Sequence, residues 1–461
     1  MDVSSRAGQT HAVMNATELP RILVVTSNNF NLTTGGGITL TNLFRGWPVD
    51  RIANVHEDHT SEDRSVCRNF YRLSDEEIRW SWPFSWAQSW RRKARSAFVG
   101  EASAGNRTSA LSAAGVGGGP FGVRISRRIM GDGMPRTVGI SARLRHWLDA
   151  FKPELLYGFL GSMAQIRLMQ RLSQTLAVPM AVHMMDNWPA VLYRRGLLGP
   201  LLRPIVQKEF QALLRGASLR LGICEDMCQE YQRRYGYPFL PFHNALDIEE
   251  WLSGARRNWT AGSPFIVRYV GSIVADGQRE SLREVCEAVS LLRTQGVPVE
   301  MWIHAPREQT AYLLASGVSW QGLHVEDSPP AGAVMHLLAG ADLLVLPFNF
   351  DARSAEYIRL SMPTKVPAYM VSGTPILVYG PSGIATTRYA EREGWGRVIS
   401  AGGVPALRKT LLDLMADQAA RERLGLRAQA LARERHDAAR VRPAFQTALA
   451  AASRSRCLAS R

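Results

Sequence analysis

The chain has 461 residues, of which 46% are hydrophobic and 21% are charged. This composition is typical of a globular protein and excludes a disordered one, and the length predicts two or three domains. Lys and Arg number 55 against 40 Asp and Glu, which gives a formal net charge of +15. A charge of this size indicates an anionic partner: a nucleic acid, an acidic membrane or a phosphorylated small molecule.

The cysteines and the apolar runs bear on the compartment. Five cysteines are scattered without the clustered spacing of a zinc site, and no uncharged apolar run reaches the ~18 residues that cross a bilayer. The first 20 residues have no long apolar core of the kind a secretory signal carries. We therefore expect reduced thiols, no metal site and a cytoplasmic protein that works in solution or at the inner face of the plasma membrane.

The first half of the chain alternates strand and helix patterns. The run Arg21–Ser27 predicts a strand, and Gly35, Gly36 and Gly37 open a helix after it. Further apolar runs predict strands at 155–160, 180–185, 219–223 and 239–242. The bare backbone of the glycines lets a ligand approach the amide N–H groups. This glycine loop is not the G-x-G-x-x-G fingerprint, and no G-x-x-x-x-G-K-[ST] stretch is present, so the sequence predicts no NAD site and no P-loop.

One segment, between residues 80 and 145, departs from this alternation. It contains an aromatic cluster just ahead of Arg91-Arg92-Lys93: Trp80, Trp82, Phe84, Trp86 and Trp90. Aromatic rings beside cations favour the headgroup layer, so one interpretation is peripheral contact with an anionic membrane. The other is an inserted loop or helix hairpin that folds against its own domain, because tryptophans also fill cores.

The strand at 180–185 is followed by a polar pair, His183 and Asp186, in the run HMMDNWP. The end of a parallel strand places such a pair to meet a ligand. The alternative is an Asx-type turn before Pro189, which Asp and Asn favour.

The second half repeats the alternation. Residues 247–263 contain few apolar side chains and predict a linker between an N-terminal domain (1–246) and a C-terminal domain (264–430). Strand patterns recur at 265–270, 299–303, 343–346 and 376–379, with a helix at 280–292. The sequence therefore predicts an α/β fold of two facing, Rossmann-like, doubly wound parallel sheets, with ligands beyond the strand carboxyl ends in the cleft between them. Arg279 opens a helix after the first of these strands, where it either pairs with a diphosphate or remains solvated.

The most informative segment is Ser361–Pro381, SMPTKVPAYMVSGTPILVYGP. Thr364 is predicted to cap a short helix, and Lys365 adds a cation beside the free N–H groups of its first turn. Gly373 is predicted to end this helix in the left-handed conformation, ahead of a buried strand at 376–379. This pattern favours a bound phosphate, with an ordinary surface helix as the alternative.

Taken in order, these motifs resemble those of GT-B glycosyltransferases of the family-4 type, closest to bacterial members that build surface polysaccharides. The resemblance runs from Arg21 to about Trp395 and rests on the following stretches: the glycine loop, HMMDNWP, Cys224–Gly236, Pro241–Asp247, Tyr269–Ser272 and Ser361–Pro381. It implies a nucleoside-diphosphate sugar donor on the C-terminal domain, an acceptor on the N-terminal domain, and retaining transfer without a metal or other cofactor. The helical tail, 431–461, would cross back to the first domain or form a basic surface helix at a membrane.

The resemblance also implies roles for individual residues. Lys365 matches the lysine of the S-x-P-x-K variant and would contact the donor phosphates, with Ser361 and Thr364 as hydroxyl donors. Gly36 and Gly37 would let the donor approach closely. Asp186 would orient the acceptor or the sugar.

Two glutamates that the family commonly carries are absent here, since Leu360 and Ala368 stand at their positions. Ser272 replaces a related arginine, which leaves Arg279 as the nearby cation for the diphosphate. Glu356 is close enough in sequence to take over a sugar or ribose contact.

Three functions follow from these observations. The first is transfer of a hexose from a nucleotide sugar to a glycan or lipid-linked acceptor in polysaccharide biosynthesis. The second is a degenerate GT-B protein that binds a glycan or a partner without transfer, because both glutamates are missing. The third is nucleic-acid binding, which rests on charge alone; no recognised module is present, and we do not expect it.

Overall fold

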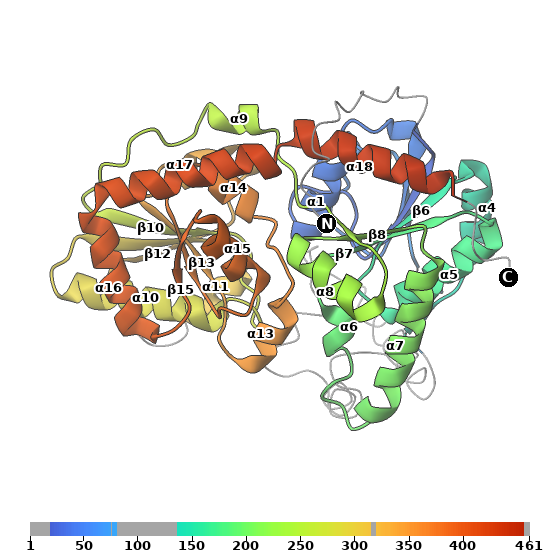
Figure 1. Ribbon diagram of the computed structural model, residues 1–461, viewed down its shortest axis with the longest axis horizontal. Coiled ribbons are helices and arrows are strands. Elements are labelled where there is room, and N and C mark those ends of the chain that lie inside the picture. The colour runs from blue at the N-terminus through green and yellow to red at the C-terminus, as the bar shows by residue number, and fades with distance from the viewer. Residues whose placement is uncertain (1–18, 75, 81–135, 315–319, 456–461) are drawn as a thin grey trace, which may run out of the picture.

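The computed structural model describes residues 19–74, 76–80, 136–314 and 320–455. Two α/β domains lie side by side, each built on one parallel sheet (Figure 1). The first sheet has the strand order β3-β2-β1-β6-β7-β8-β9 and the second has β12-β11-β10-β13-β14-β15. All neighbours in both sheets pair in parallel. The expected pair of doubly wound parallel sheets is therefore confirmed.

The strands of the first sheet are β1 (Ile22–Thr26), β2 (Ile52–His56), β3 (Asn69–Arg72), β6 (Leu155–Phe159), β7 (Met180–Met184), β8 (Leu219–Gly222) and β9 (Leu240–Pro241). Those of the second are β10 (Phe265–Val270), β11 (Val299–His304), β12 (Leu323–Glu326), β13 (Leu343–Pro347), β14 (Ile376–Tyr379) and β15 (Arg397–Ile399). The helices before the linker are α1 (Gly35–Phe44), η2 (Val49–Arg51), α4 (Ala142–Phe151), α5 (Met163–Leu176), α6 (Trp188–Val191), α7 (Gly199–Gly216) and α8 (Glu225–Tyr235). Those after it are α9 (Ile248–Leu252), α10 (Arg279–Thr294), α11 (Arg307–Leu314), η3 (Ala331–Ala333), α12 (Val334–Ala339), α13 (Ala352–Ile358), α14 (Val366–Val371), α15 (Ala385–Glu393), α16 (Gly403–Ala416), α17 (Gln418–Arg435) and α18 (Ala438–Ser453).

Strand β1 shows why these runs are continuously apolar. Successive side chains of a strand point to opposite faces, and both faces of this sheet are covered by helices. Ile22 and Val24 pack in the cluster that contains residues of α1 and α18, whereas Leu23 and Val25 pack with residues of α4, α5 and α7. All five residues of β1 are buried.

Four strands of the two parallel sheets were not predicted from the sequence: β2, β3, β12 and β15. Strand β2 is fully buried, but Asn54 interrupts its apolar run, and the Asn54 side-chain NH2 group donates to the carbonyl of Val24 at 3.2 Å. The other three are edge strands and are partly exposed, so their sequences lack a strong apolar signal.

A short antiparallel ribbon, β4 (Ile78–Trp80) and β5 (Arg136–Val138), flanks the segment for which membrane contact or an inserted hairpin was predicted. Residues 81–135, with Trp82, Phe84, Trp86 and Trp90, lie outside the described residues. In the part of the chain that is described, no helix combines the length and the hydropathy needed to cross a bilayer.

The chain crosses between the domains twice, and the two crossings are bonded to each other. Leu246 exchanges backbone hydrogen bonds with His436 and Ala438, at 2.9 and 2.8 Å. The tail expected to be helical from Leu431 is divided here, because α17 ends at Arg435 and α18 begins at Ala438. Helix α18 then packs on the first domain, while α17 covers the second (Figure 1).

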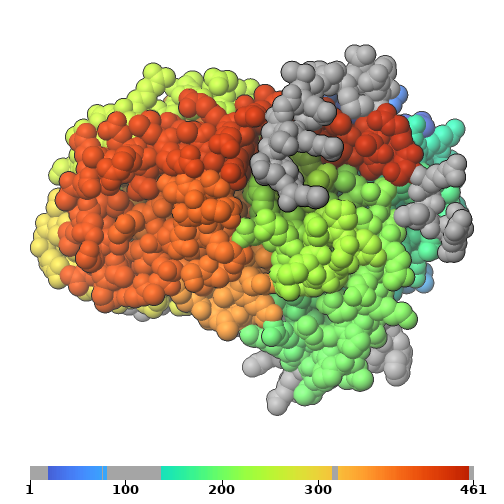
Figure 2. Space-filling view, viewed as in Figure 1, coloured from blue at the N-terminus to red at the C-terminus, as the bar shows by residue number. Residues whose placement is uncertain are grey.

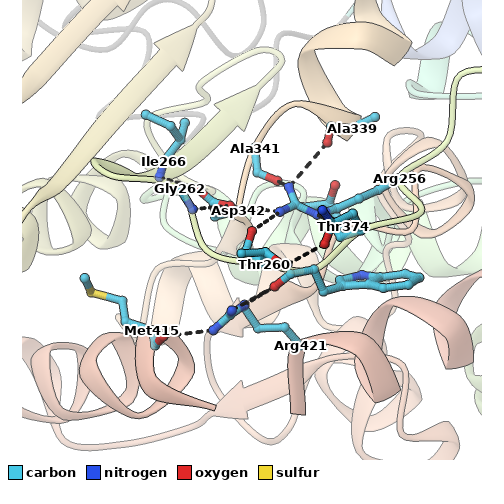
Figure 3. A network of polar contacts seen from close by, with 12 residues as sticks. Arg256, Thr260, Gly262, Ile266, Ala339, Ala341, Asp342, Thr374, Met415 and Arg421 are labelled. Carbon is cyan, nitrogen blue, oxygen red and sulfur yellow. Dashed lines mark hydrogen bonds and ion pairs between the residues drawn. The ribbon is translucent and has the colours of Figure 1, made fainter. Parts of the chain in front are cut away.

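The linker after the first crossing is held by a buried ion pair. The Arg256 guanidinium contacts Asp342 at 2.9 Å and also donates to the carbonyls of Ala341 and Thr260 (Figure 3). Asp342 accepts from the backbone N–H of Ile266, at the start of β10, at 2.9 Å. The linker is therefore fixed to the edge of the second domain.

Candidate functional site

The carboxyl ends of both sheets face the junction between the domains, and the segment Ser361–Lys365 crosses this junction. Ser361 donates a 2.6 Å hydrogen bond to Asp186, which follows β7 of the first domain. Thr364 donates to the carbonyl of Gly35 at 3.2 Å. Asn244 donates to the carbonyl of Thr364 at 2.9 Å. Residues predicted from separate motifs are thus brought together here.

Helix α14 departs from the prediction at its first residue. Lys365, not Thr364, occupies the N-cap position, and its carbonyl accepts from the N–H of Tyr369 at 2.9 Å. The prediction that Thr364 caps the helix is wrong, because its hydroxyl is engaged with the glycine loop. Gly373 has φ of +75° and ends the helix in the left-handed conformation, as predicted.

The ammonium of Lys365 lies at the carboxyl end of β10. It donates to the hydroxyl of Tyr269 at 2.6 Å, and a methyl group at Gly271 would lie 2.7 Å from Nζ. Gly271 has φ of +133°, so glycine suits this position in both conformation and size. Burial lowers the pKa of Lys365 to about 7, and no carboxylate among the described residues forms an ion pair with it. A desolvated cation without a counter-charge favours an anionic ligand.

The glycine loop is close-packed at the start of α1. A methyl group at Gly36 would lie 2.8 Å from Asn28 Oδ1, and one at Gly37 would lie 2.2 Å from Asn31 Nδ2. Thr34 caps the helix by accepting from the N–H of Gly37 at 3.2 Å. The small size of both glycines is therefore required by packing as well as by the predicted ligand approach.

Asp186 and His183 have different environments, although both were predicted to meet a ligand. Burial raises the pKa of the Asp186 carboxyl, and the hydrogen bond from Ser361 opposes this shift. His183 is fully buried in the core, where its Nδ1 lies 2.6 Å from the hydroxyl of Tyr157. The prediction that His183 meets a ligand is wrong, because its side chain is fully buried beside Tyr157.

The two remaining candidates, Arg279 and Glu356, have different partners from Lys365. The Arg279 guanidinium stacks over the ring of Tyr312 at 4.2 Å. A cavity lies between the two domains, and Arg279 does not line it. Glu356 lines that cavity and forms an ion pair with Arg194 across the domain junction. The structure therefore brings Gly36, Gly37, Asp186, Ser361, Thr364 and Lys365 to one junction, with Glu356 on the adjoining cavity.

This cavity has a volume of about 210 Å³ and lies between the domains. Its apolar wall includes Met163, Trp188 and Tyr193 of the first domain. Val274 and Tyr357 close it from the second domain, and the nearby Asp186 carboxylate, with burial, raises the pKa of the Tyr357 hydroxyl.

Six charged residues of this cavity were not predicted from the sequence: Glu57, Arg136, Arg194, Arg195, Asp276 and Arg353. Four of them pair within their own domain, Arg136 with Glu57 at 3.7 Å and Arg353 with Asp276 at 2.7 Å. Burial raises the pKa of Glu57, and the charge of Arg136 opposes this. Glu57 could have been found from its position, because it directly follows β2 at the ligand-binding edge of the sheet.

Comparison with solved structures defines the class of fold. The chain is similar to HepE of Anabaena in complex with UDP-glucose, with TM-score 0.54 and 12% identity over 93% of this chain and 99% of that one. Sucrose-phosphate synthase of Thermosynechococcus elongatus gives TM-score 0.60 and 10% identity over 93% and 98%. WaaG, a glycosyltransferase involved in lipopolysaccharide biosynthesis, gives TM-score 0.54 and 12% identity over 92% and 99%.

No protein-family model and no curated protein sequence matches the chain. The fold is that of the GT-B glycosyltransferases, and the resemblance seen in the sequence is confirmed at the level of the fold.

Proposed function

We propose that this protein is a glycosyltransferase that moves a hexose from a nucleoside-diphosphate sugar to a glycan or lipid-linked acceptor in polysaccharide biosynthesis. The observation that carries the proposal is the Lys365 ammonium, half-buried at the end of β10 without a carboxylate partner among the described residues. A diphosphate supplies the missing negative charge. The similar structures support this reading, since HepE was captured with UDP-glucose.

The donor binds at the carboxyl end of the second sheet. Lys365 contacts the diphosphate, and the absence of a side chain at Gly271 leaves room for the ammonium itself. The hydroxyls of Ser361 and Thr364 reach the phosphates after exchanging their present partners, Asp186 and Gly35. Gly36 and Gly37 let the donor approach the backbone of the facing domain closely, and Arg279 meets the diphosphate by leaving its stacking partner.

The acceptor binds in the interdomain cavity. Its apolar wall accommodates the faces of sugar rings or the first part of a lipid, and Glu57 and Glu356 accept hydrogen bonds from sugar hydroxyls. Asp186 orients the acceptor or the transferred sugar from the junction beside this cavity. The protein works in the cytoplasm, at the inner face of the membrane when the acceptor is lipid-linked.

The reaction breaks the bond between the anomeric carbon and the β-phosphate oxygen and forms a bond from that carbon to an acceptor hydroxyl on the same face. Configuration is retained because the new bond forms on the face from which the phosphate leaves, and the acceptor proton passes to that departing phosphate. Lys365 stabilises the charge that develops on the leaving group, and the mechanism requires no metal. Closing the domains excludes water, which would otherwise replace the acceptor.

A second candidate is a degenerate GT-B protein that binds a glycan or a partner without transferring sugar. It is favoured by Leu360 and Ala368, which replace the family glutamates. The Leu360 side chain is buried in the core, so this position presents no polar group to a donor.

The test is incubation of the protein with a panel of UDP-, GDP-, ADP- and dTDP-sugars, with thermal shift and donor hydrolysis as readouts. Transfer predicts that one donor protects the protein and is slowly hydrolysed, that Lys365→Ala loses both effects, and that Lys409→Ala keeps them. Lys409 is the matched control, because its ammonium is exposed and bonds Asp413 at 2.8 Å. Protection without hydrolysis or transfer would favour the degenerate protein, and no binding by any donor would refute the proposal.

A further inference from the structure

An apolar surface is exposed at the N-terminal end of α7. We define the α7 tip as residues 194–208. Leu197, Leu201 and Ile205 on it are 74%, 71% and 45% exposed. The opposite side of the same helix is buried in the domain core through Val206 and Phe210. The first turns of α7 are therefore apolar on both sides, which core packing does not explain.

The exposed side chains form one continuous stripe. Leu201, Pro204, Ile205 and Lys208 are spaced by three or four residues, and all are exposed. This spacing aligns them along one side of a helix. Exposed apolar residues gathered in this way mark an interaction surface, whereas single scattered ones need no explanation.

The charge around this stripe has one sign. Between Asp186 and Glu209 the sequence contains no carboxylate. The α7 tip carries the cations Arg194, Arg195, Arg203 and Lys208. Arg194 pairs with Glu356, and Arg203 holds the carbonyl of Ala190 at 3.0 Å. Arg195 and Lys208 are exposed, and their charges complement an anionic surface.

The α7 tip projects from the molecule and adjoins the interdomain cavity. In Figure 1 the start of α7 reaches below the rest of the first domain, and Figure 2 shows this end as a green protrusion at the lower right. Tyr193, Arg194 and Arg195 line the cavity, and Leu197 follows two residues later. The buried ring of Tyr193 anchors the loop, and Gly199 packs so closely that a methyl group there would lie 2.5 Å from the carbonyl oxygen of Tyr193.

We propose that the α7 tip docks the protein on an anionic lipid bilayer. Leu197, Leu201 and Ile205 enter the boundary between headgroups and acyl chains, and Arg195 and Lys208 contact lipid phosphates. Docking in this way places the cavity mouth next to the bilayer. Delivery of a lipid-linked acceptor to the cavity is a consequence that rests on the proposed function, whereas docking itself does not.

The test is co-sedimentation of the full chain with vesicles of 30% phosphatidylglycerol in phosphatidylcholine and with vesicles of phosphatidylcholine alone. We expect binding to the anionic vesicles and at least about tenfold weaker partitioning of the double variant Leu201→Ser/Ile205→Ser, because two exposed apolar side chains no longer enter the lipid. Lys208→Gln is expected to weaken partitioning by severalfold at low salt. Leu412→Ser/Leu426→Ser is the matched control, since both leucines are similarly exposed on α16 and α17, at 43% and 48%.

Several outcomes overturn the docking proposal. One is no binding of the wild-type chain to anionic vesicles, and another is equal binding by Leu201→Ser/Ile205→Ser, which would point to residues 81–135. A dimer in light scattering that this variant dissociates, without vesicle binding, would mean that a second copy covers the tip. Donor protection is measured on the same samples: its absence refutes the proposed function alone, and its retention in the variant shows that the variant is folded.

Discussion

Replacing Lys365 by methionine tests the half-buried cation in both stability and binding. The interval between the ordinary pKa of 10.5 and the value of about 7 corresponds to about 5 kcal/mol as an upper bound on the cost of burying the charge. Residual solvent contact reduces this cost, and losing the hydrogen bond to Tyr269 removes about 1 kcal/mol of stabilisation. We expect the ligand-free Lys365→Met protein to be more stable than wild type by about 1–3 kcal/mol at pH 6.

The pH dependence gives this prediction a definite sign. Below pH 7 the lysine is protonated in both folded and unfolded chains, so the full cost of burial destabilises the wild-type protein. Between pH 7 and about 10.5 the unfolded chain binds more protons than the folded one, so wild-type stability rises with pH relative to the variant. The advantage of Lys365→Met should therefore shrink steadily from pH 6 to pH 9.

The same substitution should abolish donor binding, because the ammonium that meets the diphosphate is gone. The assay is urea denaturation of both proteins at pH 6, 7.5 and 9, followed by thermal shift with the nucleotide sugar that protects the wild type. An advantage that does not decline with pH would contradict a desolvated lysine. Unchanged donor protection in the variant would contradict its contact with phosphate.

Two further predictions concern the framework that holds the site. Arg256→Ala leaves the Asp342 carboxylate buried without its partner and should destabilise the protein by about 3–5 kcal/mol, whereas the exposed Arg257→Ala should change stability by less than about 0.5 kcal/mol in the same urea titration. Equal stabilities of the two variants would refute the role given to the linker pair. Phe445→Ala removes a ring that packs edge-on against Phe44, at 5.2 Å, and should cost about 3–5 kcal/mol, with faster proteolysis of the tail after residue 437; a loss below about 1 kcal/mol would mean that α18 docks without this ring.

Much of the fold was predictable because buried parallel strands are continuous apolar runs. The runs at 265–270 and 376–379 correspond to β10 and β14, residue for residue. The role of Gly373 in ending its helix was equally predictable, since the left-handed conformation at a helix end favours glycine. Strands such as β12 and β15 were missed because edge strands are half exposed and carry few apolar residues.

The candidate site was predictable in its residue types and not in its contacts. Local sequence indicated a cation at Lys365, a carboxylate at Asp186 and bare backbone at Gly36, because these signals depend on neighbours along the chain. Tertiary structure alone decided that Ser361 bonds Asp186, 175 positions away, and that Arg279 stacks on Tyr312 instead of lining the cavity.

The sequence by itself determined two doubly wound domains and predicted an anion-binding motif at Ser361–Pro381 within the second one, since periodicity and turn chemistry are local properties. Only the packing of the domains decided which side chains meet in the cleft. It placed Glu57 and Arg194 on the cavity and His183 in the core. The physical reason is that burial and charge pairing are set by residues far apart in the chain, and no local pattern records them.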